Sequence, residues 1–271
     1  MKDYGYLFRH FFTHKDFLPP ADQLPGTLFT PLSLLFEAVV LLIILAGAKY
    51  LASHKKKIRP VFTVLLGTLL VLEVAIVSWD SLAGATKGLD LAVNLSLYPC
   101  SIFMYALPLY LWGKGIWKQM GCGYICTLGL LGALINFLYP ISRLTTYSCI
   151  SFPAFHTFFY HGSMLFACLV LLLSGEHSYT RVNVWWEMFL ASMPGLLVSI
   201  PANLVNYSAI HADYMYFTGQ HFIVAGVFGP VGPLRTTIYM YLVYLLIPAA
   251  FYLPAWMTKN IRNQGGALLA G

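Results

Sequence analysis

Residues 31–79 read PLSLLFEAVVLLIILAGAKYLASHKKKIRPVFTVLLGTLLVLEVAIVSW, and this stretch decides the fold of the chain. Two apolar runs, at 31–52 and 60–80, flank a short basic block from Lys55 to Arg59. Each run has the roughly 20 mostly apolar residues that a helix needs to cross the hydrocarbon core of a bilayer. The stretch therefore predicts two membrane-spanning helices joined by a charged loop.

The composition of the whole chain agrees with a membrane protein. Of its 271 residues, 59% are hydrophobic and 10% are Asp, Glu, Lys or Arg, whereas a soluble domain carries about 25% charged residues. This balance excludes a soluble enzyme, a disulfide scaffold, a disordered chain and a collagen-like fibre. The formal net charge of +6 comes from short basic blocks between apolar runs, which usually record membrane orientation. We therefore expect no nucleic-acid partner.

Five further apolar stretches have the length of a membrane span. They lie at 93–113, 121–139, 153–174, 183–207 and 234–257. The first three of these carry Pro, Asn and His, which are costly in lipid and mark the spans to question. The sequence predicts an all-α polytopic membrane protein, folded as a seven-transmembrane-helix bundle that forms a single transmembrane domain over residues 1–271.

The basic residues predict how the bundle is oriented. With seven spans, ten Lys and Arg residues fall on the side of the Lys55–Arg59 block and six on the other side. The positive-inside rule places that block in the cytoplasm, the N-terminus outside and the C-terminus inside. Residues 1–30 are then extracytoplasmic, with 6–17 either an interfacial amphipathic segment or a partly ordered tail, and 258–271 form a cytoplasmic tail.

The expected location is an integral, multi-pass position in a membrane. The first 27 residues lack the apolar core and cleavage site of a signal peptide, so the first span is predicted to act as its own anchor. This suits a bacterial cytoplasmic membrane, with a eukaryotic organelle as the open alternative.

Polar residues of the predicted spans gather toward the outer side of the membrane. They include Glu37, Glu73, Cys100, Asn136, His156, His161, Asn203 and Asn206, with Arg143 and Asp213 just beyond span ends. Ionisable groups inside a membrane mark a functional site by default, because each is costly unless it is paired or hydrated. The alternative for Glu37, Asn203 and Asn206 is a hydrogen bond that joins neighbouring helices. Cys122 and Cys126 lack further ligands, so no metal site is expected.

Cys100 and His161 form the most specific pair in this set. Each lies seven or eight residues into its predicted span, so both are about 10 Å below the outer boundary at 1.5 Å of rise per residue. A thiol needs a neighbouring base or positive charge to become a nucleophilic thiolate. His156 lies about a turn and a half nearer the surface and points to a different helix face, so it is the second candidate for the base.

Three stretches of the chain resemble a known family. They are LSLYPCSI around Cys100, HTFFYHG around His161, and NLVNYSAIHADYMY from Asn203 to Tyr216; the later GPVGPLRTTIYMYLVY resembles the lead into the last span. The chain is similar in these stretches to the YwaF-like bacterial integral membrane proteins. Eukaryotic relatives of that group are multi-span acyltransferases that act on ether phospholipids. The resemblance covers about residues 90–245 and implies that Cys100 is a nucleophile with a histidine base. Ser96, Leu97 and Tyr98 lack the histidine found in that stretch of bacterial relatives.

The sequence and the resemblance together predict an intramembrane, cysteine-dependent lipid acyltransferase. Cys100 attacks a phospholipid ester to form an acyl-thioester, and a lysophospholipid or similar hydroxyl acceptor then takes the acyl chain. Supporting or substrate-binding roles fall to Asn203, Asn206, Arg143, Glu73 and Asp213, with membrane phospholipids and lysophospholipids as partners and no cofactor. The alternatives are a lipid hydrolase with the same Cys/His pair, or a heptahelical receptor or small-solute transporter. The oligomeric state is left open.

Overall fold

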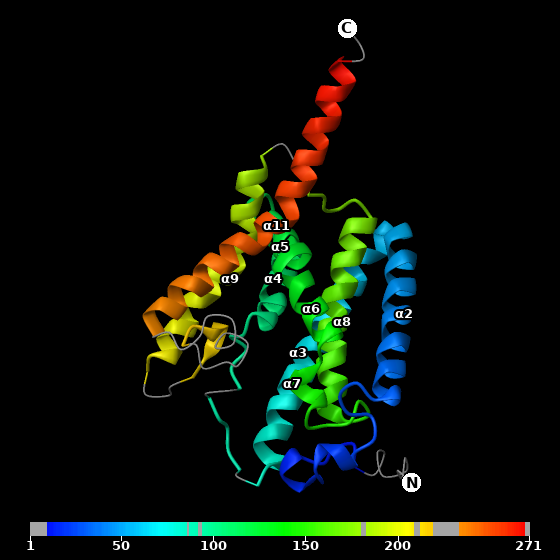
Figure 1. Cartoon of the computed structure of the whole chain (residues 1–271), viewed down its shortest axis with the longest axis vertical. Coiled ribbons are helices and arrows are strands. Elements are labelled where there is room, and N and C mark those ends of the chain that lie inside the picture. Colours follow the sequence, from blue (N-terminus) through cyan, green and yellow to red (C-terminus); the bar gives the residue numbers. More distant parts are fainter. Residues whose placement is uncertain are drawn as a thin grey trace. The chain divides into compact units, whose positions relative to one another are not determined.

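The computed structural model describes residues 10–85, 87–91, 94–179, 183–208, 212–218 and 233–268, and the regular elements in these ranges are helices (Figure 1). By compactness the chain divides into two units. The first unit contains residues 1–90 and 130–170, and the second contains 91–129 and 171–271. Each unit is described below by itself.

Within the described residues, six helices are long and apolar enough to cross a membrane. They are α2 (Pro31–Ser53); Lys55–Ala83, made of η3 (Lys55–Lys57) and α3 (Ile58–Ala83); Ile116–Leu138, made of α5 (Ile116–Tyr124), the π-helix η5 (Ile125–Gly129) and α6 (Leu130–Leu138); α8 (Phe152–Leu173); α9 (Val184–Asn206); and Leu234–Thr258 within α11 (Pro233–Leu268). The protein is therefore an all-helical, multi-pass membrane protein, and six of the seven predicted stretches have their helix.

The remaining predicted stretch, 93–113, has a shorter helix. Helix begins only at Cys100, as η4 (Cys100–Ile102), and continues as α4 (Phe103–Trp112). At 1.5 Å per residue these 13 residues extend about 20 Å, less than the roughly 30 Å of a bilayer core. Residues 94–99, directly before Cys100, form turns and bends. Hydrogen bonds from distant tyrosines, described below, hold this backbone outside a helix.

The first unit packs α2 against α8 through small residues. A Cβ atom on Gly47 would lie 3.4 Å from the Phe166 ring, and one on Gly162 would lie 3.1 Å from the Ile44 side chain. The two helices therefore approach closely and run side by side (Figure 1). Apolar side chains on the other faces of this unit stay exposed, including Leu42 at 66% and Val71 at 68%. Lipid is the medium that such surfaces suit, since water would disfavour them.

The segment before α2 folds onto the end of α3. The His14 ring lies between two carboxylates, 3.0 Å from Asp16 and 3.3 Å from Asp80, and Trp79 donates its indole N–H to the Phe12 carbonyl at 2.9 Å. Residues 10–17 form turns and the short 3-10 helix η1 (Lys15–Phe17), so the amphipathic helix considered for this region is not found in its described part. Residues 1–9 lie outside the described residues.

The second unit is built on glycines that let helices touch. A Cβ atom on Gly121 of α5 would meet the Ala106 carbonyl oxygen of α4 at 2.6 Å. One on Gly123 would meet Ala191 of α9 at 2.9 Å. Only hydrogen fits at either position, so these glycines fix how α4, α5 and α9 pack. Val184 and Ala191 of α9 and Tyr252 of α11 form a small buried core.

Candidate functional site

Cys100 is the first residue of a helix, whereas the apolar run predicted that it lies seven residues inside one. Pro99 caps the helix, and the Tyr124 hydroxyl of α5 donates a short hydrogen bond to the Pro99 carbonyl. The Cys100 side chain is half-buried. The N-terminal end of a helix carries a partial positive charge, which stabilises a thiolate relative to a thiol. For the sulfur to attack, a base must still take the thiol proton.

The end of α9 holds the loop that follows it through one side chain. The Asn206 amide donates to the Tyr214 carbonyl at 2.7 Å and accepts the Tyr214 N–H at 2.6 Å. Asn206 is 2% exposed, so both bonds are shielded from competing solvent. The amide thereby fixes the start of η6 (Tyr214–Tyr216) against the last turn of α9.

Tyr214 connects that loop to the turns and bends before Cys100. Its hydroxyl accepts the Leu95 N–H at 2.9 Å and donates to the Leu91 carbonyl at 2.5 Å. The Tyr98 ring packs on Tyr214 and Tyr216, with centroids 4.9 Å and 5.8 Å away. Two of the stretches that carry the family resemblance, around Cys100 and from Asn203 to Tyr216, therefore lie against each other within the second unit.

The loop beside Cys100 has a strained backbone. Met215 and Tyr216 both have positive φ angles, of 57° and 59°, which side-chain-bearing residues rarely adopt. Such residues cost about 1–3 kcal/mol each and persist where the surrounding structure over-determines them, often at functional sites. Here the Asn206 bonds on one side and the Tyr244 hydroxyl, which donates to the Met215 carbonyl at 3.0 Å, provide that support.

Tyr216 lies on the loop that packs against Tyr98, two residues before Cys100. Burial raises the pKa of Tyr216 above its ordinary value, and Cys100, Tyr98 and Asp213 raise it further. A phenol is protonated at neutral pH even at its ordinary pKa of about 10, so the Tyr216 hydroxyl can donate a hydrogen bond. Asp213 itself accepts the Thr218 N–H at 2.9 Å and the Thr218 hydroxyl, which closes the loop after η6.

Asn203 joins two helices. Its amide donates to the Tyr241 hydroxyl of α11 at 3.0 Å, and Ser199 lies 2.8 Å from the same hydroxyl. Its side-chain oxygen has no hydrogen-bond partner among the described residues. The contact with Tyr241 is the helix-joining alternative that the sequence left open for this residue.

The two histidines of α8 have different partners in the first unit. His156 Nε2 lies 3.1 Å from the Glu73 carboxylate of α3. His161 Nδ1 lies 2.9 Å from the Thr157 carbonyl, and because a carbonyl only accepts, Nδ1 carries the proton. That tautomer leaves Nε2 of His161 with the lone pair that a general base needs.

The predicted site residues are divided between the two units, and Arg143 lies in the first. Arg143 is half-buried in the short helix α7 (Ile141–Leu144). Cys100, Asn203, Asn206 and Asp213 belong to the second unit, so the pairing of Cys100 with either histidine stays a prediction from the sequence. Among the residues searched, those that the structure describes, no three His, Cys, Asp or Glu side chains gather as a metal ion requires.

The tyrosines of this site are not among the residues that the sequence predicted. Tyr98, Tyr124, Tyr214 and Tyr216 surround the Cys100 segment, whereas aromatic residues in a membrane protein usually indicate interfacial belts. Their signal was present: three of the four lie inside the two stretches that carry the resemblance.

Comparison with known proteins adds a family to this geometry. The model of one protein family, described as the TMEM164 family, matches residues 26–254. No curated protein and no solved structure shows a significant match to the chain. The matched range includes Cys100, both α8 histidines and the whole Asn203–Tyr216 stretch.

Proposed function

The chain belongs to the TMEM164 family, and from that premise we propose that it is an intramembrane phospholipid acyltransferase with Cys100 as its nucleophile. The observation that carries this proposal is the position of Cys100 at a helix N-terminus, held by Tyr124 and packed beside the strained Tyr214–Tyr216 loop. The resemblance to YwaF-like proteins, and through them to ether-phospholipid acyltransferases, supports the same class of reaction.

The proposed reaction has two steps. In the first, the Cys100 sulfur attacks the ester carbonyl of a phospholipid, the C–S bond forms, and the C–O bond breaks. The thiol proton passes to a base and then to the departing lysophospholipid oxygen. In the second step, the hydroxyl of an acceptor lysolipid attacks the thioester, gives its proton to the same base, and the Cys100 thiol is regenerated. No cofactor is needed for either step.

We assign the supporting roles from the contacts of each side chain. His161 is the proposed base, because its Nδ1 proton is fixed on a carbonyl and its Nε2 keeps a lone pair. His156, oriented by Glu73, is the second candidate. Tyr216 is the proposed donor to the oxyanion, because its ring packs on Tyr98, two residues before Cys100, and its phenol carries a proton to donate.

The other predicted residues take positioning and binding roles in this proposal. Both polar atoms of the Asn206 amide bond to Tyr214, so Asn206 positions the loop. Asp213 closes that loop through Thr218. Asn203 and Arg143 are proposed to contact the phosphate or the developing oxyanion.

The proposal includes seven membrane crossings with the N-terminus outside. The helix that begins at Cys100 covers about 20 Å, and the segment before it completes the crossing. Non-helical backbone inside a membrane requires partners for its polar groups. Tyrosine hydroxyls provide them here at Leu91, Leu95, Ser96 and Pro99. A bacterial cytoplasmic membrane remains the proposed location.

Intact mass spectrometry tests the proposal. Purified protein is incubated with phospholipid and measured before and after neutral hydroxylamine, which cleaves thioesters. We expect a hydroxylamine-labile acyl adduct in the wild type and in Cys168→Ala, and no adduct in Cys100→Ala. A free Cys100 thiol under single-turnover conditions contradicts the proposal. Adding a lysophospholipid then separates transfer from hydrolysis, because a diacyl product indicates a transferase and free fatty acid indicates a hydrolase.

A further inference from the structure

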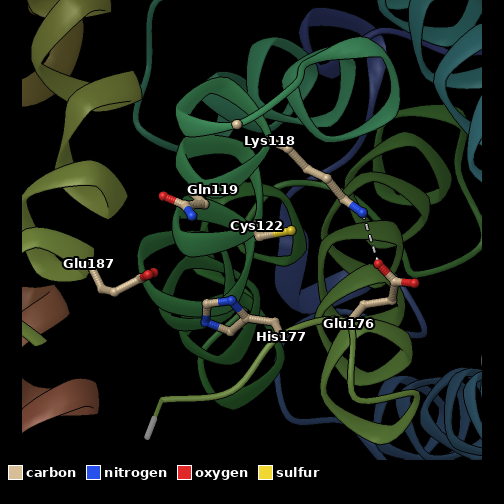
Figure 2. A pocket seen from close by; sticks show the side chains of 7 residues that line it. Lys118, Gln119, Cys122, Glu176, His177 and Glu187 are labelled. Atoms are coloured by element: carbon tan, nitrogen blue, oxygen red, sulfur yellow. Dashed lines mark hydrogen bonds and ion pairs between the residues drawn. The ribbon is translucent and has the colours of Figure 1, made fainter. Parts of the chain in front are cut away.

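A second polar site lies in the same unit, at the other end of the helices that hold Cys100. A cavity of about 190 Å³ is lined by Gly115, Lys118, Gln119, Cys122, Glu176, His177 and Glu187 (Figure 2). The helix that starts at Cys100 ends at Trp112, just before this lining begins, and α9 runs from Glu187 near the cavity to Asn206 beside Tyr214. The cavity is therefore distinct from the candidate acyl-transfer site.

The walls of this cavity bury groups that are costly to bury. His177 is 3% exposed, Cys122 is 4% exposed and Glu187 is 7% exposed. Burial of a carboxylate or an imidazole is unfavourable, and an apolar filling of the same volume would be easier to fold. One water occupies about 30 Å³ in the liquid, so the space is several times larger than a single structural water requires. The cavity is therefore large enough for a molecule of only a few non-hydrogen atoms.

The mouth of the cavity already holds one ammonium group. The Lys118 ammonium lies 3.0 Å from the Glu176 carboxylate and 5.2 Å from the centre of the Tyr110 ring. Both side chains of the ion pair are partly exposed, at 45% and 33%. Lys118 itself therefore occupies this carboxylate and the nearby aromatic ring, a combination that binds ammonium groups in proteins.

The deeper wall offers hydrogen-bond acceptors. Figure 2 shows the side chains of Gln119, Glu187 and His177 directed toward one space, with Cys122 beside them. His177 Nε2 lies 3.1 Å from the Tyr252 hydroxyl, which fixes the ring in place. The Glu187 carboxylate and the Gln119 amide oxygen accept hydrogen bonds, and a primary ammonium has three N–H groups to donate.

From this lining we propose that the cavity binds a small, water-soluble primary amine in its ammonium form. The ammonium donates to Glu187 and Gln119, in the deeper part of the cavity, while the Lys118–Glu176 pair stays at the mouth. The proposal does not depend on the acyl-transfer chemistry at Cys100, so either can fail without the other.

Methylammonium is the probe for the first experiment. The full-length protein in detergent is heated with methylammonium chloride or with sodium chloride at equal ionic strength, and the unfolding midpoint is followed by intrinsic fluorescence. A ligand that binds the folded state raises the midpoint with its concentration. We expect methylammonium to raise it saturably. Tetramethylammonium, which has no N–H group, should have no effect beyond that of sodium, and an equal effect of the two ions overturns the proposal.

The variant Glu187→Gln keeps the shape of the side chain and removes its charge. A hydrogen bond to a charged group contributes about 1.5–3 kcal/mol, so we expect methylammonium to bind at least about tenfold more weakly. Asp22→Asn makes the same chemical change at an exposed residue of η2 (Ala21–Gln23) and should leave binding unchanged. Unchanged binding in Glu187→Gln contradicts the proposal.

A measurement on the wild type covers the case in which the variant does not fold. Cys122 lines the cavity, whereas Cys126, one turn further along the same span, is fully buried and does not line it. Methylammonium should slow the reaction of Cys122 with a small methanethiosulfonate reagent in proportion to occupancy, as measured by peptide mass. Alkylation of Cys122 at the same rate with and without saturating methylammonium overturns the assignment.

Discussion

The side-chain amide of Asn206 forms two hydrogen bonds with the backbone of Tyr214, eight residues later, at 2.7 Å and 2.6 Å. Tyr214 in turn bonds through its hydroxyl to the segment that leads into Cys100. One amide therefore determines where the loop lies and, through the loop, where the segment before the proposed nucleophile lies.

The variant Asn206→Ala should destabilise the second unit. It leaves a buried N–H and a buried carbonyl of Tyr214 without their partner, and each such group costs about 1–3 kcal/mol. We expect a lower free energy of unfolding in SDS titrations and a slower formation of the acyl adduct. For the free energy of unfolding, Asn203→Ala is the matched control, because it loses a single bond to Tyr241 and should cost less. An equal loss of unfolding free energy in the two variants would contradict the role given to the two Asn206 hydrogen bonds.

The variant Tyr124→Phe tests the bond to the Pro99 carbonyl. Loss of the hydroxyl removes one hydrogen bond at the helix start, which contributes about 0.5–1.5 kcal/mol, and loosens the turn that carries Cys100. We expect slower adduct formation and a lower unfolding midpoint. Tyr105→Phe loses a similar bond, to the Ser96 carbonyl, at a side chain that is 43% exposed. Its effect on both measurements should be smaller, and the reverse order would refute the role given to Tyr124.

Glycine 121 has no room for a side chain. In Gly121→Ala the new Cβ would lie 2.6 Å from backbone atoms of Ala106 and Tyr110, so α4 and α5 must separate. Overpacking of this kind costs about 1–3 kcal/mol, which SDS unfolding measures. In Gly67→Ala the Cβ meets nothing within 4 Å, and alanine favours helix by about 1 kcal/mol, so stability should rise or stay the same. A loss of stability in Gly67→Ala as large as that in Gly121→Ala would contradict this account.

The Glu73–His156 contact should appear as a coupling energy. A double-mutant cycle with Glu73→Gln, His156→Gln and the combination measures it by unfolding in SDS. Residues in contact couple by about 0.5–3 kcal/mol, and we expect a value in this range because both side chains are largely buried, at 21% and 12% exposure. Additive single variants would show that the 3.1 Å contact does not stabilise the protein. The rate of acyl-adduct formation in His156→Gln, compared with that in His161→Gln, shows which of the two histidines the reaction requires.

The contact between Asp16 and the end of α3 predicts a pH dependence. The Ala85 N–H donates to the Asp16 carboxylate at 2.8 Å and lowers its pKa below the ordinary 3.8, with His14 and Lys15 adding to the effect and partial burial opposing it. A depressed pKa stabilises the folded state above pH 3.8, and this stabilisation is lost as the pH falls through the folded-state pKa. The unfolding midpoint of Asp16→Asn should therefore fall less than that of the wild type on acidification below pH 3.8. If the unfolding midpoints of the two proteins fall in parallel with pH, the Asp16–Ala85 contact does not stabilise the folded state.

The sequence predicted the long helices well, whereas the roles of the site residues stay predictions. The runs at 31–52 and 153–174 match α2 and α8 to within one residue, because a membrane span is encoded locally by its length and hydropathy. The run at 93–113 looks equally continuous, yet its helix starts at Cys100, since Tyr124 and Tyr214 hold the preceding backbone from distant parts of the chain. Such contacts leave no local pattern.

The cavity at Lys118 shows a second limit of sequence reasoning. Lys118 was interpreted only as an orientation signal, because a charge near a span end usually serves that purpose. Its contacts with Glu176 and Tyr110 join three separate segments, and no spacing rule connects them. Glu73 and His156 were each recognised as costly residues, but 83 positions separate the two partners, and their contact required the structure.

Tyrosine hydroxyls repeatedly satisfy main-chain carbonyls in the second unit. Tyr105, Tyr124, Tyr179, Tyr214 and Tyr244 donate to Ser96, Pro99, Cys126, Leu91 and Met215. In a soluble protein, solvent would serve many of these carbonyls, but the bilayer interior supplies none. Each phenol thus acts as a water molecule that is covalently attached to the chain. A protein equipped in this way can keep turns, a π-helix and a strained loop in place without relying on water to satisfy their carbonyls.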